Sequence, residues 1–233
     1  MATDRKQRCR ASSRVCPLPA SRGWGHNGVV TTKDAEIQAR IEQLGRFFMG
    51  TSDVHLAMAR VVKTLEELGI PYAICGAMAV NVHGLKRATE DVDVLLTPAG
   101  LAQFKAHALG RGFVEKFPGS RGVKDAETKV PIDFLLTGGA PGDGVPRGLL
   151  FPDPKDVAIE SAGKRYVALA TLIEMKVGCA MTAPDRPRDF DDVIRLIRVN
   201  ELGEHFADHL HPYVQAKYRE LWRLAQLPPA MPE

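Results

Sequence analysis

The apolar positions between residues 37 and 69 predict two successive helices. The first helix has an apolar stripe at helical intervals and ends near Gly50. Ser52 or Asp53 can cap the second helix, and Gly69 can end it. The stripes consist of Ile37, Ile41, Leu44 and Phe48 in the first helix and of Leu56, Val62, Leu65 and Leu68 in the second.

From residue 72 onward the pattern changes to short strands separated by turns. Residues 72–75 form an apolar run that is halted by Gly76, and residues 77–80 are compatible with a short helix. Residues 91–96 alternate before they become wholly apolar, as in a central strand. A threonine cap followed by proline then favours a helix over residues 97–109.

The rest of the chain predicts three more strands, a loop and a helical region. Strands are expected at 112–117 and at 130–136, where Pro131 marks the beginning or a bulge, and the second is expected to pair with 91–96. Residues 137–155 are rich in Gly and Pro and predict a lid, an insertion or a boundary. A short strand at 165–167 is followed by helices at 169–182, 188–199, 201–210 and 212–226. The predicted fold class is therefore α+β, with a mostly helical C-terminal part.

The net charge of +3 is concentrated at the N-terminus of the 233-residue chain. Residues 1–32 contain six basic residues and one acid, which leaves 25 basic and 27 acidic residues for the remainder. Without an apolar period, this basic tail is predicted to be disordered, either as a solvated extension or as a nucleic-acid arm. We expect a core with N-terminal helices over 33–150 and a helical part packed on it over 151–227.

Cysteine usage and hydropathy predict a cytoplasmic protein without a membrane partner. No segment offers the ~18 consecutive apolar residues of a membrane span, and the tail lacks the apolar run of a secretory signal. Cys9, Cys16, Cys75 and Cys179 show no paired ligand spacing. Free thiols are therefore expected, rather than a zinc site or a disulfide framework.

Three aspartates on two predicted strands are the main chemical signal. Asp91 and Asp93 project to one face because side chains alternate along a strand, and Asp133 lies between apolar neighbours in the same way. If the strands are adjacent, the three carboxylates converge and repel one another unless a cation lies between them. Mg²⁺ is the expected ion, and two such ions about 3.5–4 Å apart can serve phosphoryl-group chemistry. Backbone amides at the Gly76 turn are expected to approach the phosphates.

The combination of a Gly76–Ala77 turn, the Asp91 and Asp93 pair and the later Asp133 resembles the nucleotidyltransferase superfamily. The segments 76–84, 87–93, 172–176 and 186–193 are similar to its abortive-infection (type IV toxin) group. This resemblance covers residues 55–200 and implies a nucleotidyltransferase-like mixed sheet flanked by helices, with 33–150 as the catalytic core. One departure is Ala77, which stands where the superfamily usually has Gly or Ser, so that only backbone amides would serve the phosphates there.

Each of the remaining candidate residues has more than one interpretation. Lys176, on an otherwise apolar helix, either reaches the triphosphate or extends to the surface. Arg87 either meets a phosphate or an acceptor backbone or is exposed to solvent. Asp189 favours a helix start, takes part in catalysis directly or orients Lys176. His83 is a candidate base, or else a packed or surface residue. The nucleotide-binding residues expected from the resemblance are Gly76, Ala77, Arg87, Lys176 and Asp189.

The leading functional hypothesis is transfer of a nucleoside monophosphate from ATP or another NTP to an acceptor hydroxyl, with Mg²⁺ as the cofactor. Asp91 and Asp93 would bind the metal, and Asp133 would complete the site and help to activate the acceptor. The resemblance implies tRNA or protein as the acceptor, a toxin or defence role and an antitoxin partner. The alternatives are an aminoglycoside-type adenylyltransferase and a non-catalytic nucleotide- or partner-binding protein. A glycosyltransferase would leave the glycine turn and Asp133 unexplained.

Overall fold

The computed structural model describes residues 32–183 and 186–228. The chain divides into a unit Met1–Gln38 and a unit Ala39–Glu233, and the second unit carries every site discussed below. Helix α1 (Thr32–Phe48) confirms the first predicted helix. The predicted basic tail lies outside the described residues, apart from Thr32. Among the described helices, none has the length and apolar character needed to cross a membrane.

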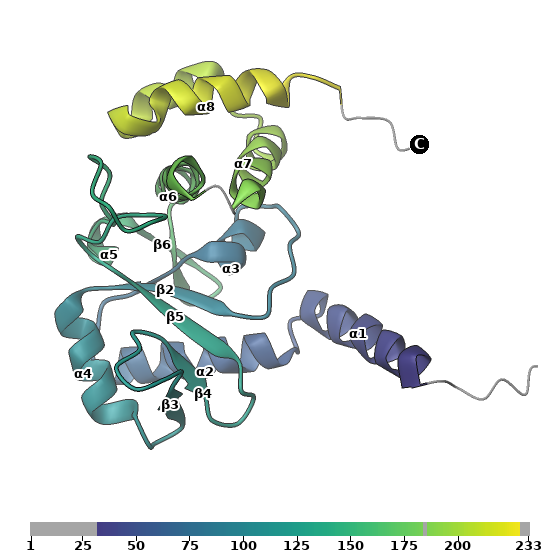
Figure 1. Ribbon diagram of the computed structural model, residues 1–233, viewed down its shortest axis with the longest axis vertical. Helices are drawn as coiled ribbons and strands as arrows, with labels where there is room; N and C mark the ends of the chain where they lie inside the picture. Colours follow the sequence, from purple (N-terminus) through teal and green to yellow (C-terminus); the bar gives the residue numbers. More distant parts are fainter. Residues whose placement is uncertain (1–31, 184–185, 229–233) are drawn as a thin grey trace, which may run out of the picture. The chain divides into compact units, whose positions relative to one another are not determined.

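A seven-stranded mixed sheet forms the centre of the Ala39–Glu233 unit (Figure 1). Its spatial order is β3-β4-β5-β2-β1-β7-β6. The central strand β2 pairs in parallel with β5 and antiparallel with β1. This arrangement confirms the predicted α+β class and the predicted pairing of the two aspartate-bearing strands. The strands are β1 (Ala73–Ile74), β2 (Val92–Leu96), β3 (Phe113–Glu115), β4 (Val123–Asp125), β5 (Pro131–Leu136), β6 (Ala158–Ser161) and β7 (Lys164–Val167).

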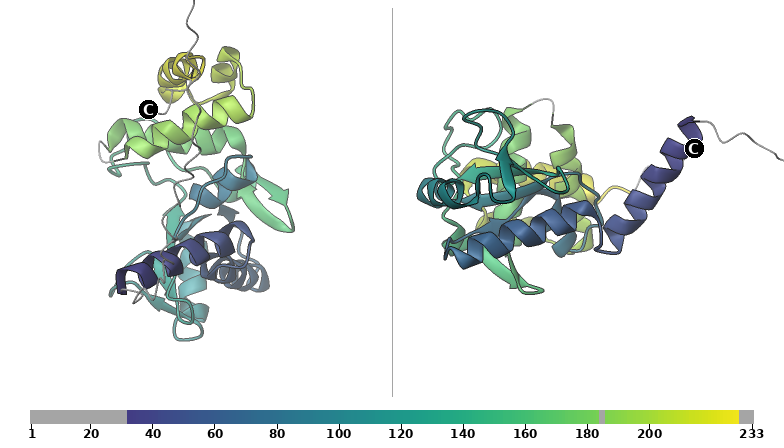
Figure 2. Two further views of the ribbon diagram at one scale, coloured as in Figure 1. Left: turned by 90° about the vertical axis from the view of Figure 1, so that its right-hand side faces the viewer. Right: turned by 90° about the horizontal axis from the view of Figure 1, so that it is seen from below.

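Helices cover both faces of this sheet, as the perpendicular views also show (Figures 1 and 2). Helices α2 and α4 lie on one face, and α3 and α6 lie on the other. Helix α7 packs against both α6 and α8. Helix α8 lies beyond α6 and α7, on the side away from the sheet (Figure 1). The helices of this unit are α2 (Asp53–Glu67), α3 (Gly76–Val82), α4 (Pro98–Ala108), α5 (Pro154–Val157), α6 (Leu169–Thr182), α7 (Pro187–Val199) and α8 (Pro212–Ala225), with a 3-10 helix η1 (Glu204–His209).

Two apolar clusters hold the unit together, and α6 contributes to both. Leu172 of α6 packs with the sheet core, whereas Ile173 and Val177 pack with α7, η1 and α8. A helix that is apolar on nearly all sides is expected to be buried on nearly all sides. Helix α6 therefore joins the sheet to the C-terminal helices. The division proposed at residues 150 and 151 remains a prediction.

An ion pair links α2 to strand β4 of the sheet. Arg60 donates two hydrogen bonds of 2.7 Å to the carboxylate of Asp125, which is fully buried at the end of β4. Thr128 adds a backbone and a hydroxyl hydrogen bond of 2.8 and 2.6 Å. Burial alone would raise the pKa of Asp125, but the hydrogen bonds from Arg60 and Thr128 outweigh it and hold that pKa at about 2.

Several sequence predictions needed correction. Leu56, which the sequence predicts on the apolar stripe of α2, is 47% exposed. The buried face of this helix carries Ala57 and Val61 instead. The stripe of α1 is also exposed, and Phe47 is its buried neighbour. Strands β4 and β6 were missed because each is short and polar in part. The helix predicted at 201–210 is only η1.

Candidate active site

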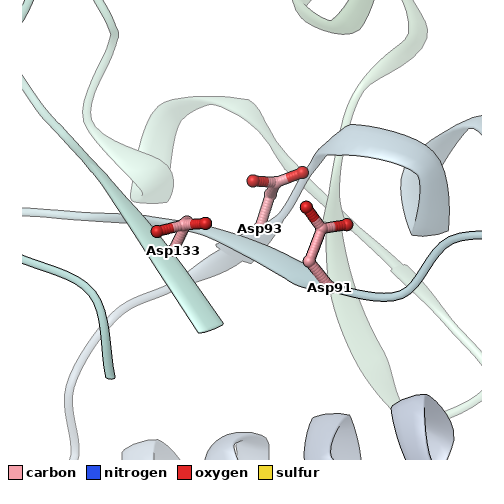
Figure 3. A group of neighbouring side chains, drawn as sticks. All are labelled: Asp91, Asp93 and Asp133. Carbon is pink, nitrogen blue, oxygen red and sulfur yellow. The ribbon is translucent and has the colours of Figure 1, made fainter. Parts of the chain in front are cut away.

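The pairing of β2 with β5 brings the three predicted aspartates together. The register places Asp93 directly beside Asp133, and Asp91 lies just before β2. One carboxylate oxygen from each aspartate lies within 4.8 Å of the others. Figure 3 shows the three side chains extending from the two strands toward a common region. This acidic triad (Asp91, Asp93 and Asp133) confirms the predicted convergence.

The acidic triad is electrostatically unfavourable without a cation. Burial, followed by the charges of Asp91 and Asp133, raises the pKa of Asp93 from 3.8 to about 7, although Lys176 and Arg186 act in the opposite direction. Carboxylate oxygens are the ligands that Mg²⁺ prefers. The donor type and the spacing of the triad therefore fit a hard divalent cation.

Gly76 is required by the close approach of its backbone to Asp93. Its φ angle is +58°, and a Cβ added there would lie 1.9 Å from Asp93 Oδ2. A glycine at the start of α3 therefore satisfies both the backbone conformation and the lack of space. The neighbouring Ala77 is buried. Both residues line the same cavity as the triad.

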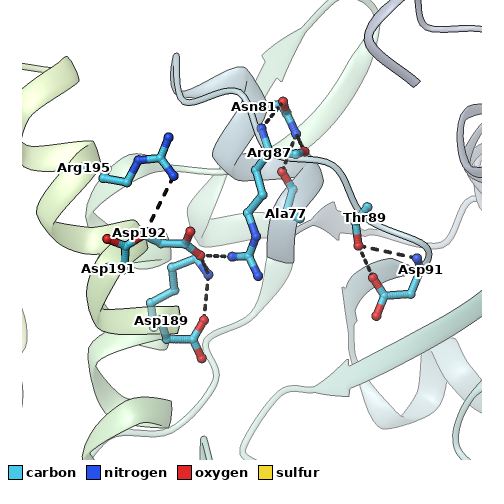
Figure 4. Close-up of polar contacts among 10 residues, drawn as sticks. Ala77, Asn81, Arg87, Thr89, Asp91, Asp189, Asp191, Asp192 and Arg195 are labelled. Carbon is cyan, nitrogen blue, oxygen red and sulfur yellow. Dashed lines mark hydrogen bonds and ion pairs between the residues drawn. The ribbon is translucent and has the colours of Figure 1, made fainter. Parts of the chain in front are cut away.

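The segment between α3 and β2 is held by side-chain hydrogen bonds (Figure 4). Asn81 Nδ2 donates to the carbonyls of Ala77 and Arg87 at 2.8 and 2.6 Å, and Asn81 Oδ1 accepts from the Arg87 amide at 3.0 Å. The Thr89 hydroxyl donates to an Asp91 carboxylate oxygen. These contacts fix the backbone that leads into β2, and thus the positions of Arg87 and Asp91.

A buried ion-pair cluster lies beside the triad and includes one residue that the sequence did not identify. The Lys176 ammonium lies 2.8 Å from Asp189 and 2.6 Å from Asp192, and Asp192 also accepts from Arg87 (Figure 4). Only 6% of Lys176 and 3% of Asp192 are exposed. The hypothesis that Lys176 extends to the surface is therefore wrong. The hypothesis that Arg87 is a solvent-exposed arginine is also wrong, because its guanidinium pairs with Asp192. Asp192 follows Asp189 by three residues on α7, so both face the same way.

Burial lowers the pKa of Lys176, although the charge and the hydrogen bond of Asp189 favour its charged form. A lysine ammonium has three donors. Two of them are taken by Asp189 and Asp192, which leaves one to point elsewhere.

The triad and the ion-pair cluster open on one cavity of about 1500 Å³. Its wall also includes an apolar portion with Phe151, Leu172 and Met175. Among the described residues, the basic ones that line it are Arg40, Arg87, Lys116, Arg121, Lys176, Arg186 and Arg188. The described acidic residues that line it outside the triad are Glu90, Asp143 and Asp189. The cavity therefore combines a carboxylate cluster with a predominantly basic surround.

The chain is distantly similar to several solved structures. The antibiotic-resistance factor ANT(2'')-Ia in solution shares 18% identity with the chain, over 72% of this chain and 95% of that one, with a TM-score of 0.47. Its crystal form in complex with adenylyl-2"-tobramycin shares 17% over 70% and 95%, with a TM-score of 0.46. JHP933 from Helicobacter pylori shares 16% over 74% and 78%, with a TM-score of 0.41. No protein-family model and no curated protein matches the sequence.

Other candidates from the sequence have structural roles. His83 Nε2 lies 2.9 Å from the Val167 carbonyl, where it links the end of α3 to β7. Tyr218 is buried in the C-terminal cluster, and the Trp222 indole donates to the Leu202 carbonyl at 2.9 Å. Tyr218 and Trp222 of α8 thus pack against the body of the protein. Cys75 and Cys179 are free thiols, as expected.

Proposed function

We propose that the protein is a metal-dependent nucleotidyltransferase that moves a nucleoside monophosphate from an NTP to an acceptor hydroxyl. The observation that carries this proposal is the convergence of Asp91, Asp93 and Asp133 at the wall of a cavity large enough for a nucleotide. In the reaction, the acceptor oxygen forms a bond to the α-phosphorus, the bond to the pyrophosphate oxygen breaks, and the hydroxyl proton is released.

The triad would hold Mg²⁺, which supplies Lewis-acid stabilisation of phosphate charge when it is bound. Asp91 and Asp93 would be the principal ligands, and Asp133 would complete the site on the acceptor side. Gly76 leaves space for the triphosphate close to Asp93, since any side chain there would enter the triad. Arg87 and the free donor of Lys176 would compensate triphosphate charge. Asp189 and Asp192 would orient that ammonium.

The charge of the cavity favours a polyanionic acceptor. Arg40, Arg121, Arg186 and Arg188 line it in addition to the residues assigned to the triphosphate. Guanidinium groups bind phosphates through several donors, and phosphate contacts position a nucleic acid on a protein. A cationic aminoglycoside would instead need acidic residues around the triad, where Glu90, Asp143 and Asp189 are outnumbered. We therefore favour an RNA hydroxyl, with tRNA as the acceptor that the family resemblance implies.

A labelling experiment with competing acceptors tests this choice. The full chain and its Asp93→Asn variant are each incubated with Mg²⁺ and one α-³²P-labelled NTP at a time, in the presence of total cellular RNA, cellular protein or an aminoglycoside. The proposal predicts label on RNA with the wild type alone. Label on the aminoglycoside would support the adenylyltransferase alternative, and label on protein would replace RNA as the acceptor. An absence of label on all three would favour a non-catalytic nucleotide-binding protein.

The toxin or defence role and the antitoxin partner remain predictions from the resemblance. Induced expression of the wild type should slow bacterial growth if the modified RNA is required for translation. The Asp93→Asn variant, expressed to the same level, should not do so. Equal growth with both proteins would argue against a toxin.

A further inference from the structure

The Lys116 ammonium forms an ion pair with Asp133, one of the three carboxylates of the acidic triad. The Lys116 ammonium lies 2.6 Å from Asp133 Oδ1 and 2.6 Å from Asp133 Oδ2. These are short distances for N–H···O contacts and typical of hydrogen bonds between charged groups. The Lys116 side chain is only 22% exposed, so most of it lies out of solvent. Lys116 therefore occupies a defined position in the site.

The loop that carries Lys116 is tied down by several hydrogen bonds. This loop, residues 116–122, joins β3 to β4. At its start, the Glu115 carboxylate accepts from the Lys105 ammonium at 2.7 Å and from the Gly119 amide at 3.1 Å. Further along, the Gly122 amide donates to the Ser120 hydroxyl at 3.1 Å. The loop thus presents Lys116 from a fixed base.

Gly122 packs directly behind the Lys116–Asp133 pair. A Cβ added to Gly122 would lie 2.6 Å from Asp133 Oδ1 and 3.2 Å from Lys116 Cδ. The backbone therefore approaches both members of the pair as closely as a residue without a side chain allows. This close packing restricts Asp133 on the side of the loop.

Building on the proposed function, we propose that Lys116 makes metal binding by the acidic triad depend on the nucleotide. In the free protein its ammonium occupies the Asp133 side of the triad, and it must release at least one oxygen before Asp133 can become a metal ligand. Two cations at contact distance from the same carboxylate repel each other, so Lys116 weakens the binding of a bare divalent ion. A metal that arrives with a nucleotide brings phosphate oxygens, which can accept the released ammonium. Lys116 thereby favours the metal–nucleotide complex over the metal alone.

Metal binding measured without any activity tests this role. Mn²⁺ is titrated into the full chain by calorimetry, in the absence of nucleotide, for the wild type, Lys116→Met, Lys116→Arg and Asp93→Asn. The control is Lys124→Met, which removes an exposed lysine from the neighbouring strand β4. We expect Lys116→Met to bind Mn²⁺ about tenfold more tightly than the wild type, because a competing charge has been removed. Lys116→Arg and the Lys124 control should remain close to the wild type.

The possible results separate this inference from the proposed function. Equal or weaker Mn²⁺ binding by Lys116→Met, together with loss of binding in Asp93→Asn, would overturn the role of Lys116 and leave the metal site intact. An absence of Mn²⁺ binding in every protein, even with a non-hydrolysable NTP analogue added, would contradict the metal site itself. A second measurement uses that analogue: the preference for Mn²⁺–nucleotide over bare Mn²⁺ should fall in Lys116→Met, and an unchanged preference would also overturn the proposal.

Discussion

Replacing Asp93 by asparagine should stabilise the metal-free protein above neutral pH. The pKa of Asp93 is raised from 3.8 to about 7, first by burial and then by Asp91 and Asp133. This difference corresponds to at most roughly 4 kcal/mol, since one pKa unit is about 1.4 kcal/mol. Asp93 lines an open cavity, so solvent screening reduces the effect, and we expect about 2 kcal/mol. Asparagine keeps the shape of the side chain and removes its charge.

The pH dependence follows from the direction of this shift. Below about pH 4, Asp93 is neutral in both the folded and the unfolded protein, so its carboxylate costs no stability. Between pH 4 and pH 7 the unfolded state loses the proton while the folded state keeps it, so wild-type stability falls as the pH rises. Above pH 7 both states are ionised and the full cost is present. The Asn variant should lack this decrease.

Urea denaturation in EDTA, at pH values from 4 to 9, measures the difference between the two proteins. The variant should match the wild type near pH 4 and exceed it by about 2 kcal/mol at pH 8. Added Mg²⁺ should then raise wild-type stability and leave the variant nearly unchanged. A variant that is less stable than the wild type at pH 8 in EDTA, or a difference that does not vary with pH, would refute the repulsion ascribed to the triad.

Three further substitutions test other parts of the structure. Gly76→Ala should lose metal affinity and should destabilise the fold by more than the control Gly69→Ala, as measured in urea titrations. Gly69 has a similar φ of +64° but open space around it, so Gly69→Ala should cost only about 1 kcal/mol. Lys176→Met should weaken NTP binding in calorimetry and cost roughly 3 kcal/mol of stability, since two carboxylates lose a buried partner. Wild-type NTP affinity would remove this lysine from the nucleotide site. Arg60→Met should cost about 3 kcal/mol at pH 7. That cost should shrink as the pH falls from about 4 to 2 and Asp125 is protonated, and a cost independent of pH would contradict the assigned pairing.

The acidic triad could be predicted from the sequence because local rules determine it. Alternation along a strand places Asp91 and Asp93 on one face, and the apolar neighbours of Asp133 identify a second strand. The remaining requirement was that the two strands pair, which the β2–β5 register confirms. The long, strongly periodic helices were predictable for the same reason. Gly76 was also identified, although its close approach to Asp93 was visible only in the structure.

The residues that the sequence missed act through contacts between distant segments. Asp192 is a site neighbour because it accepts from Arg87, 105 positions away, and no spacing rule connects the two. Lys116 reaches Asp133 from a loop whose path depends on β4, a strand too short and polar to be recognised. The sequence left open whether Lys176 is exposed or buried, because one lysine on an apolar helix can extend to the surface or lie in the interior. The burial of Lys176 against Asp189 and Asp192 of α7 decides between them.

The fates of two phosphorus labels, followed in parallel reactions, test nucleotidyl transfer by the acidic triad most directly. The wild type is incubated with Mg²⁺, cellular RNA and the same NTP labelled either at the α- or at the γ-phosphate. Nucleotidyl transfer by the acidic triad predicts that the α-label becomes covalently attached to RNA while the γ-label is released as pyrophosphate, and that Asp93→Asn or EDTA abolishes both. Attachment of the γ-label, release of both labels in small molecules, or full turnover by Asp93→Asn would contradict the central claim.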